Sequence, residues 1–96
     1  MPKLLCRMKV TIPETVMVNE LGREGVLLDL ANGEYFSLDE VGMDMWKAFV
    51  RCGSTEAACS ELLPCYAIDG ITLQRDLDSF AETLAAQQLL VMGSGE

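Results

Sequence analysis

Hydrophobic positions follow two different spacings in this 96-residue chain, one typical of strands before residue 39 and one typical of helices after it. Runs rich in valine, leucine and aromatic residues predict three short strands, at about 16–21, 24–30 and 34–38. Asn32-Gly33 stands between the last two runs. Because both residues tolerate positive φ, this pair predicts a tight hairpin turn. The three strands are expected to form a small antiparallel sheet.

Helical spacing begins after the hairpin and predicts three helices. Asp39 and Asp69 are suitable N-caps for the first and third, and Ser54 or Thr55 opens a shorter second helix that Pro64 ends or kinks. The residues expected on the buried faces are Leu38, Val41, Met45, Trp46, Phe49 and Val50 in the first helix, Ala58, Cys59, Leu62 and Leu63 in the second, and Leu73, Leu77, Phe80, Ala81 and Leu84 in the third.

The length of the chain indicates one domain. Residues 1–14 show no clear period and are expected to be a loosely ordered basic segment, residues 15–92 to form the domain, and residues 93–96 to be a polar tail. Leu89-Leu90-Val91 is expected to pack on the core as a short strand or an extended segment. The fold class predicted is therefore α+β, a three-stranded antiparallel sheet followed by three helices.

Charge is distributed unevenly along the sequence. The net charge is −8, yet the first 13 residues carry +3 and the remainder −11. An acidic surface repels phosphate backbones and attracts basic peptides, so no nucleic-acid partner is expected; the alternative is that acidity only keeps the domain soluble. No apolar run approaches the roughly 18 residues of a membrane span, and Arg7 and Lys9 interrupt any signal-peptide pattern. A cytoplasmic protein without a membrane partner is expected.

The residues needed for catalysis and metal binding are nearly absent. The chain has no histidine, which removes the usual general base near neutral pH and the imidazole ligands of metals. The four cysteines, Cys6, Cys52, Cys59 and Cys65, form no CxxC pair and are expected to be core or surface thiols. No catalytic residue, metal site or cofactor is predicted.

The third predicted strand offers a different activity, because an edge strand presents unpaired backbone groups to which an extended peptide can add as a further strand. The candidate site is the groove between this strand and the third helix. The alternative is that the chain's own terminal segment covers the edge.

Over roughly residues 15–91 the sequence resembles the PqqD family, small domains also called RiPP recognition elements. The matching segments occur in order as Val26-Leu27-Leu28-Asp29, Gly33 to Gly42, Met45-Trp46, Gly53-Ser54-Thr55, Leu62 to Tyr66, Asp76-Leu77 with Phe80 and Leu84, and Leu89-Leu90-Val91. One departure is Gln88, which stands where the family commonly has a glycine.

The resemblance implies a winged-helix-like fold without catalytic activity. It implies a peptide chaperone that binds the leader of a ribosomally made precursor peptide by strand addition and presents it to a modifying enzyme. That partner would be a radical SAM enzyme, as in pyrroloquinoline quinone (PQQ) biosynthesis, or a leader protease, as for lasso peptides. Carried over by position, the peptide-binding residues are Glu34, Tyr35, Phe36, Ser37 and Leu38 on the strand, and Arg75, Ser79, Glu82 and Thr83 on the third helix.

Two other functions remain open from the residues alone. One is a DNA-binding regulator of winged-helix type, against which the acidic third helix argues. The other is a structural subunit of a larger complex. A homodimer formed by exchange of the first strands or the N-terminal segment is a further alternative.

Overall fold

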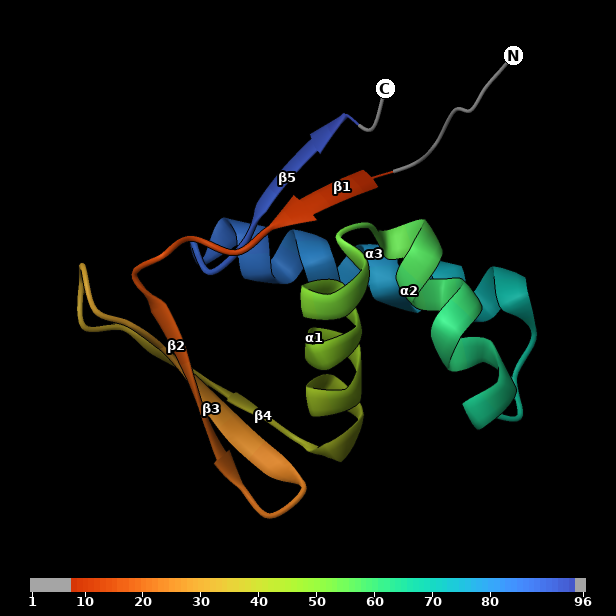
Figure 1. The fold of residues 1–96 in the computed structure, drawn as a ribbon, viewed down its shortest axis with the longest axis horizontal. Coiled ribbons are helices and arrows are strands. Elements are labelled where there is room, and N and C mark those ends of the chain that lie inside the picture. Colours follow the sequence, from red (N-terminus) through yellow and green to blue (C-terminus); the bar gives the residue numbers. More distant parts are fainter. Residues whose placement is uncertain (1–7, 95–96) are drawn as a thin grey trace.

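The computed structural model describes residues 8–94, which fold into two small sheets and a group of helices (Figure 1). The elements in chain order are β1 (Met8–Thr11), β2 (Val16–Leu21), β3 (Glu24–Asp29), β4 (Tyr35–Leu38), α1 (Glu40–Cys52), α2 (Thr55–Leu62), the 3₁₀-helix η1 (Leu63–Cys65), α3 (Gly70–Ala86) and β5 (Val91–Ser94). All three α-helices lie on one side of the sheet formed by β2, β3 and β4 (Figure 1).

The predicted antiparallel sheet is confirmed, with the order β2-β3-β4. Leu27 lies opposite Val18 on β2 and opposite Phe36 on β4, which places these three side chains on one face of the sheet. Leu27 is completely buried and Phe36 is half-buried. This face of the sheet therefore contacts the core, and the strand boundaries agree with the predicted ones to within a residue.

The loop between β3 and β4 differs from the predicted two-residue turn. Asp29 donates its N–H to the carbonyl of Glu34 at 2.9 Å, so the loop contains the four residues 30–33. Gly33 has positive φ (76°), whereas Asn32 does not. The carboxylate of the buried Asp29 accepts the N–H of Ala31, and its carbonyl accepts the N–H of Gly33. These local hydrogen bonds favour the longer loop over the tight turn.

Helix α1 begins and ends at the predicted residues, but its buried face is rotated. Asp39 accepts the N–H of Gly42 at 2.8 Å, and the helix ends at Gly53 with φ of 75°. Val41 and Val50, predicted to be buried, are 45% and 57% exposed. The buried residues of α1 are Gly42, Met43, Met45, Trp46, Ala48 and Phe49.

Met43 is buried because it packs against the sheet. A Cβ added to Gly25 on β3 would lie only 2.6 Å from the Met43 sulfur, so the two residues are in close contact. Trp46, with 3% exposure, belongs to the core as predicted. Helix α1 is thus buried on two sides, by the sheet and by the other helices.

Helix α2 is short, as predicted. Ser54 caps it by accepting the N–H of Ala57 at 3.0 Å, and Ala58, Cys59 and Leu62 are buried. Pro64 does not lie within α2 but within η1, where its fixed φ and missing N–H are tolerated. The change of helix type turns Leu63 outward to 38% exposure, which corrects its predicted burial.

Helix α3 has the predicted N-cap and an unusual C-terminus. Asp69 accepts the N–H of Thr72 at 2.7 Å. At the other end Leu89 donates its N–H to Leu84 and Gln88 donates to Ala85, the pattern of a Schellman motif. Gln88 has φ of 64°. The departure noted in the sequence is therefore a non-glycine residue at the one position of this motif that favours glycine.

A second sheet, formed by β1 and β5, was not predicted. Met8 pairs with Ser94 and Thr11 with Val91 in an antiparallel register. The expectation of a loosely ordered N-terminal segment does not hold for residues 8–11, and the expected polar tail begins within β5; residues 1–7 and 95–96 lie outside the described residues. Because the terminal strand pairs with β1, it does not cover β4.

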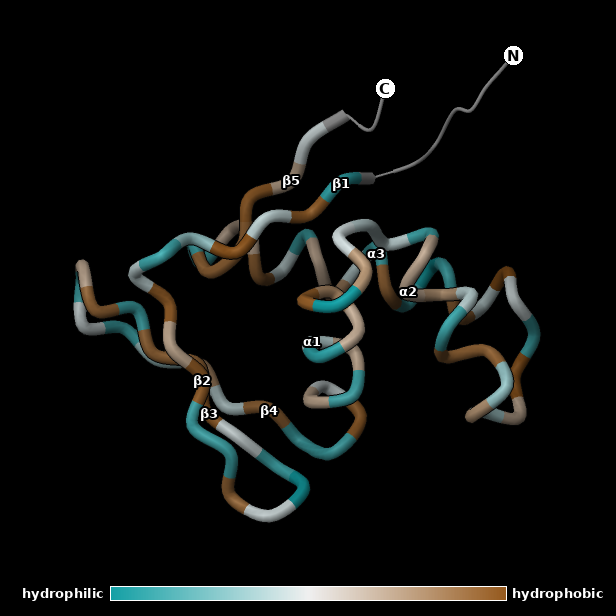
Figure 2. The backbone as a smooth tube through the Cα atoms, viewed as in Figure 1, coloured by the Kyte–Doolittle hydropathy of each residue, from teal (hydrophilic) through white to brown (hydrophobic). Residues whose placement is uncertain are grey.

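The core lies between the three-stranded sheet and the helices. It includes Leu27 and Leu38 from the sheet, and Leu89 and Leu90, which precede β5 and are each 2% exposed. In Figure 2, hydrophobic segments recur along the strands of the larger sheet and along the helices. Within residues 8–94 no helix is long and apolar enough to span a membrane.

Candidate functional site

Strand β4 is an edge strand whose outer side has no partner within residues 8–94. The hydrogen bond from the Asp29 N–H to the Glu34 carbonyl shows that these two residues are a hydrogen-bonded pair of the antiparallel ladder between β3 and β4. In such a ladder every second residue of a strand directs its N–H and carbonyl groups toward the neighbouring strand. Phe36 and Leu38 therefore direct their backbone polar groups toward β3. Tyr35 and Ser37 direct their N–H and carbonyl groups outward. Two residues of β4 thus present free donors and acceptors to an added strand.

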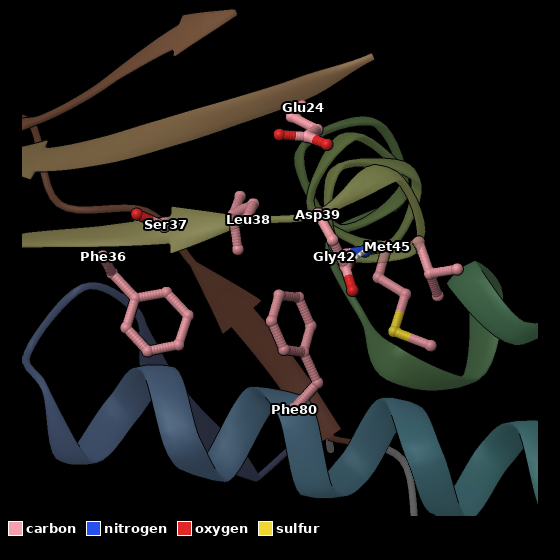
Figure 3. A pocket seen from close by; sticks show the side chains of 9 residues that line it. Glu24, Phe36, Ser37, Leu38, Asp39, Gly42, Met45 and Phe80 are labelled. Carbon is pink, nitrogen blue, oxygen red and sulfur yellow. Dashed lines mark hydrogen bonds between the residues drawn. The ribbon is translucent and has the colours of Figure 1, made fainter. Parts of the chain in front are cut away.

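A groove of about 550 Å³ lies beside this edge (Figure 3). It is lined by Glu24, Phe36, Ser37, Leu38, Asp39, Val41, Gly42, Met45 and Phe80. Figure 3 shows the Phe36 ring pointing from β4 toward α3 and the Phe80 ring pointing from α3 toward β4. The groove therefore has an apolar floor next to a strand edge with free backbone groups, the combination used to bind extended peptides.

The wall formed by α3 is fixed to the core through Phe80. Its ring stacks on that of Phe49 with centroids 5.8 Å apart and an angle of 24° between the planes. Phe49 is 1% exposed, whereas Phe80 is only partly buried and lines the groove. A ring packed against an immobile neighbour loses little further rotational freedom when a ligand contacts it.

The charged residues among the nine that line the groove are both acidic, Glu24 and Asp39. One oxygen of Asp39 is engaged by the N–H of Gly42 at the start of α1. The charged side chains of the groove are therefore negative, which disfavours a phosphate backbone and favours peptides with basic residues.

Three of the five predicted strand residues line the groove, but none of the four predicted helix residues does. Phe36, Ser37 and Leu38 line it, Tyr35 turns its side chain to the opposite face of the sheet with 72% exposure, and Glu34 immediately precedes β4. Of the helix residues, which are Arg75, Ser79, Glu82 and Thr83, none lines this groove.

These four helix residues all lie on α3 and are exposed. Arg75 lines a separate shallow depression at the start of α3, together with Asp69, Ile71 and Asp78 among others. Thr83 is three residues after Phe80 and thus shares its side of the helix.

Six groove residues were not predicted as site residues: Glu24, Asp39, Val41, Gly42, Met45 and Phe80. Phe80, Met45 and Val41 were assigned to the core because they fit the apolar spacing of α3 and α1. Phe80 lies at the border of its stripe, next to Ser79, whereas Leu73, Leu77, Ala81 and Leu84 form the completely buried row. An aromatic residue at the border of an otherwise aliphatic stripe is the signal that could have identified it.

No group of three or more metal-ligating side chains occurs among residues 8–94. The described cysteines are free thiols, with Cys59 buried, Cys52 partly buried and Cys65 exposed. Burial raises the pKa of the Cys59 thiol, and Asp78 raises it further. Burial also raises the pKa of Cys52, which donates a hydrogen bond to Glu61 at 3.2 Å. These shifts disfavour the thiolate form needed for nucleophilic chemistry.

Comparison with known proteins decides the family. Residues 24–90 match the family of coenzyme PQQ synthesis protein D, PqqD. The chain belongs to the PqqD family. This match covers the sheet edge, the groove and the whole of α3, so each groove residue lies within the PqqD-like part of the chain. No curated protein matches the sequence.

Two solved structures have the same fold. TbiB1 in complex with the TbiA(beta) leader peptide is 34% identical, with a TM-score of 0.77 over 82% of this chain and 92% of that one. Lasso peptide synthetase B1 complexed with the leader peptide is 18% identical, with a TM-score of 0.77 over 86% of this chain and 98% of that one. The second likeness shows the fold alone, and together they confirm the predicted α+β architecture.

Proposed function

We propose that this domain is a noncatalytic adaptor that binds the leader segment of a ribosomally made precursor peptide by strand addition along β4. The leader occupies the groove between β4, the start of α1 and α3, and the precursor core is held near the modifying enzyme that acts on it. Attachment to the adaptor raises the effective concentration of the core at that enzyme.

The observation that carries this proposal is the free edge of β4 beside an apolar groove. Tyr35 and Ser37 supply main-chain groups for the added strand, each hydrogen bond contributing about 1 kcal/mol net. Phe36 and Phe80 supply the apolar contact surface. PqqD family membership and the leader complex of the 34% identical TbiB1 support the same assignment.

Strand β2 is the other edge of the same sheet, and it provides a comparison. Its residues 17–21 are all exposed, and none of them lines the groove beside β4. Of the two edges of this sheet, β4 is the one that combines free backbone groups with a hollow that holds the side chains of an added strand.

The partner enzyme is proposed to be a radical SAM enzyme or a leader protease, and the adaptor supplies no catalytic group of its own. The absence of histidine from the sequence supports this assignment.

A titration followed by two-dimensional NMR tests the proposal. The labelled domain is titrated with a candidate leader peptide, sought among the genes next to its own, and, separately, with a scrambled peptide of the same composition. We expect amide shifts concentrated at residues 34–38 and around Phe80 on α3 with the leader alone. Shifts confined to β2, or none with a folded domain at saturating peptide, would contradict the proposal.

A further inference from the structure

The face of the larger sheet that points away from the helices is unusually apolar. The strand register places Met17, Leu28 and Tyr35 in one row across β2, β3 and β4. Alternation along each strand adds Leu21 on β2 and Val26 on β3 to the same face. We call this surface the outer face; its polar members are Asn19, Glu24 and Ser37.

This outer face is open to solvent. Met17 is 54% exposed, Leu21 61% and Tyr35 72%. The opposite face of the sheet contains the buried Leu27 and Leu38 and packs on α1. Figure 1 shows no element of the described chain on the outer side of this sheet. These three exposed side chains and the half-buried Val26 and Leu28 form one contiguous apolar face, the kind of surface that marks a protein–protein interaction site.

We propose that the outer face is the surface on which the modifying enzyme docks. The identity of this partner rests on the proposed function, but the location rests on the apolar residues of the outer face, none of which lines the groove. Tyr35 links the two surfaces, because its side chain lies on the outer face while its backbone faces the free edge. A leader added beside β4 widens the sheet by one strand. The docked enzyme therefore contacts the domain and the outward-facing side chains of the leader together.

The charge of the domain favours an enzyme over a second copy of this chain. The net charge is −8, and the loops next to the outer face carry Glu14 and Glu34, both exposed. Arg23, in the turn between β2 and β3, is engaged by Glu40 at 3.1 Å. Two copies stacked through this face would bring these acidic residues together, whereas a partner with an apolar patch and a basic rim is complementary.

The experiment measures binding of a purified candidate enzyme, a radical SAM enzyme or a leader protease sought among the genes next to that of the domain, to the intact domain with and without leader peptide. Met17→Lys and Leu21→Lys change β2, none of whose residues lines the groove, and introduce a charge that a basic partner rim repels. Ile71→Lys on α3 is the matched control, because Ile71 is apolar and 79% exposed but lies outside the sheet.

We expect each β2 variant to weaken enzyme binding at least tenfold while leader affinity changes less than twofold, and Ile71→Lys to change neither. Enzyme binding that is absent for the wild type, or equally weakened by Ile71→Lys, would overturn the proposal. A wild-type dimer by light scattering that Met17→Lys and Leu21→Lys dissociate would assign the face to a second copy instead. A wild type that binds enzyme but no leader would count against the groove alone, not against the outer face.

Discussion

The ring of Phe80 stacks on the ring of Phe49, with centroids 5.8 Å apart, so one side chain of the groove is also a part of the core. Phe49 is fully buried in α1, and Phe80 projects from α3 into the groove beside β4. The position of α3 relative to β4, and hence the width of the groove, depends on this contact. Stability and peptide affinity are therefore coupled at Phe80.

Replacing Phe80 tests this coupling. Phe80→Ala removes a partly buried aromatic ring and is expected to lower the free energy of unfolding by about 2 kcal/mol and leader affinity at least tenfold. Phe80→Leu keeps apolar contact with Phe49 and is expected to lose less of both. Urea unfolding and isothermal titration calorimetry measure the two effects. Unchanged leader affinity for a folded Phe80→Ala domain would exclude the ring from the binding site.

The backbone of Ser37 is expected to bind the leader. Ser37→Pro removes an N–H that points away from β3, so the ladder between β3 and β4 is retained, and proline is tolerated on an edge strand. The loss of one hydrogen bond, about 1 kcal/mol, corresponds to at least about fivefold weaker leader binding. Ser37→Ala keeps the N–H and is expected to bind within twofold of the wild type. Equal affinities for all three proteins would show that the leader does not use this edge.

Gln88→Gly is expected to stabilise the domain. Gln88 has φ of 64° at the C-terminus of α3, where a side chain is strained and glycine is not. The expected gain in the free energy of unfolding is about 0.5–1 kcal/mol. Gln87→Gly is the control, because Gln87 has φ of −91° and gains nothing from glycine. Thermal and urea unfolding measure the stability of the two variants. If Gln88→Gly is no more stable than Gln87→Gly, the backbone of Gln88 is not strained in the wild type.

Asp69 is expected to make stability depend on pH in the acid range. The Thr72 backbone N–H donates to its carboxylate and holds the pKa of Asp69 below the ordinary 3.8. The unfolded chain therefore takes up this proton first, so the contribution is present above pH 3.8 and is lost as pH falls through the folded pKa. Asp69→Asn keeps the acceptor without the charge. The urea midpoint of the wild type should exceed that of Asp69→Asn by more at pH 7 than at pH 3. An equal difference in midpoint at the two pH values would contradict the lowered pKa of Asp69.

The cysteines are expected to react with iodoacetamide in a fixed order. Cys65 is exposed, whereas Cys59 is 8% exposed and burial raises the pKa of its thiol, which leaves less thiolate at pH 8. Peptide mass spectrometry after timed alkylation should show Cys65 modified first and Cys59 protected until urea unfolds the domain. Equal alkylation rates for these two thiols in the native protein would contradict the packing of Cys59, on α2, against the start of α3.

Local signals in the sequence predicted the elements well. Asp39, Asp69 and Gly53 act on backbone groups within a few residues, and the structure confirms all three as helix boundaries. The strand edge of the candidate site was predicted for the same reason, because alternating apolar residues around Phe36 indicate a strand wherever it packs.

Features that depend on contacts distant in sequence were not predicted. Strand β1 exists through pairing with β5, 80 to 86 residues later in the sequence, and the four residues of β1 do not by themselves predict a strand. Met43 is buried because Gly25 leaves space for it, a property of the strand rather than of the helix. Phe80 was read as core because spacing along α3 cannot distinguish a ring that faces the interior from one that closes a groove.

Pairing of Met8 with Ser94 also determines how the domain responds to force. The two outermost described residues lie side by side at the open end of the ladder formed by β1 and β5. A load applied across these residues opens the hydrogen bonds one pair at a time, like a zipper, rather than shearing them together. An unfolding machine that pulls on β5 therefore meets low resistance until it reaches Leu89 and Leu90, whereas one that pulls on β1 reaches the buried core at Val10.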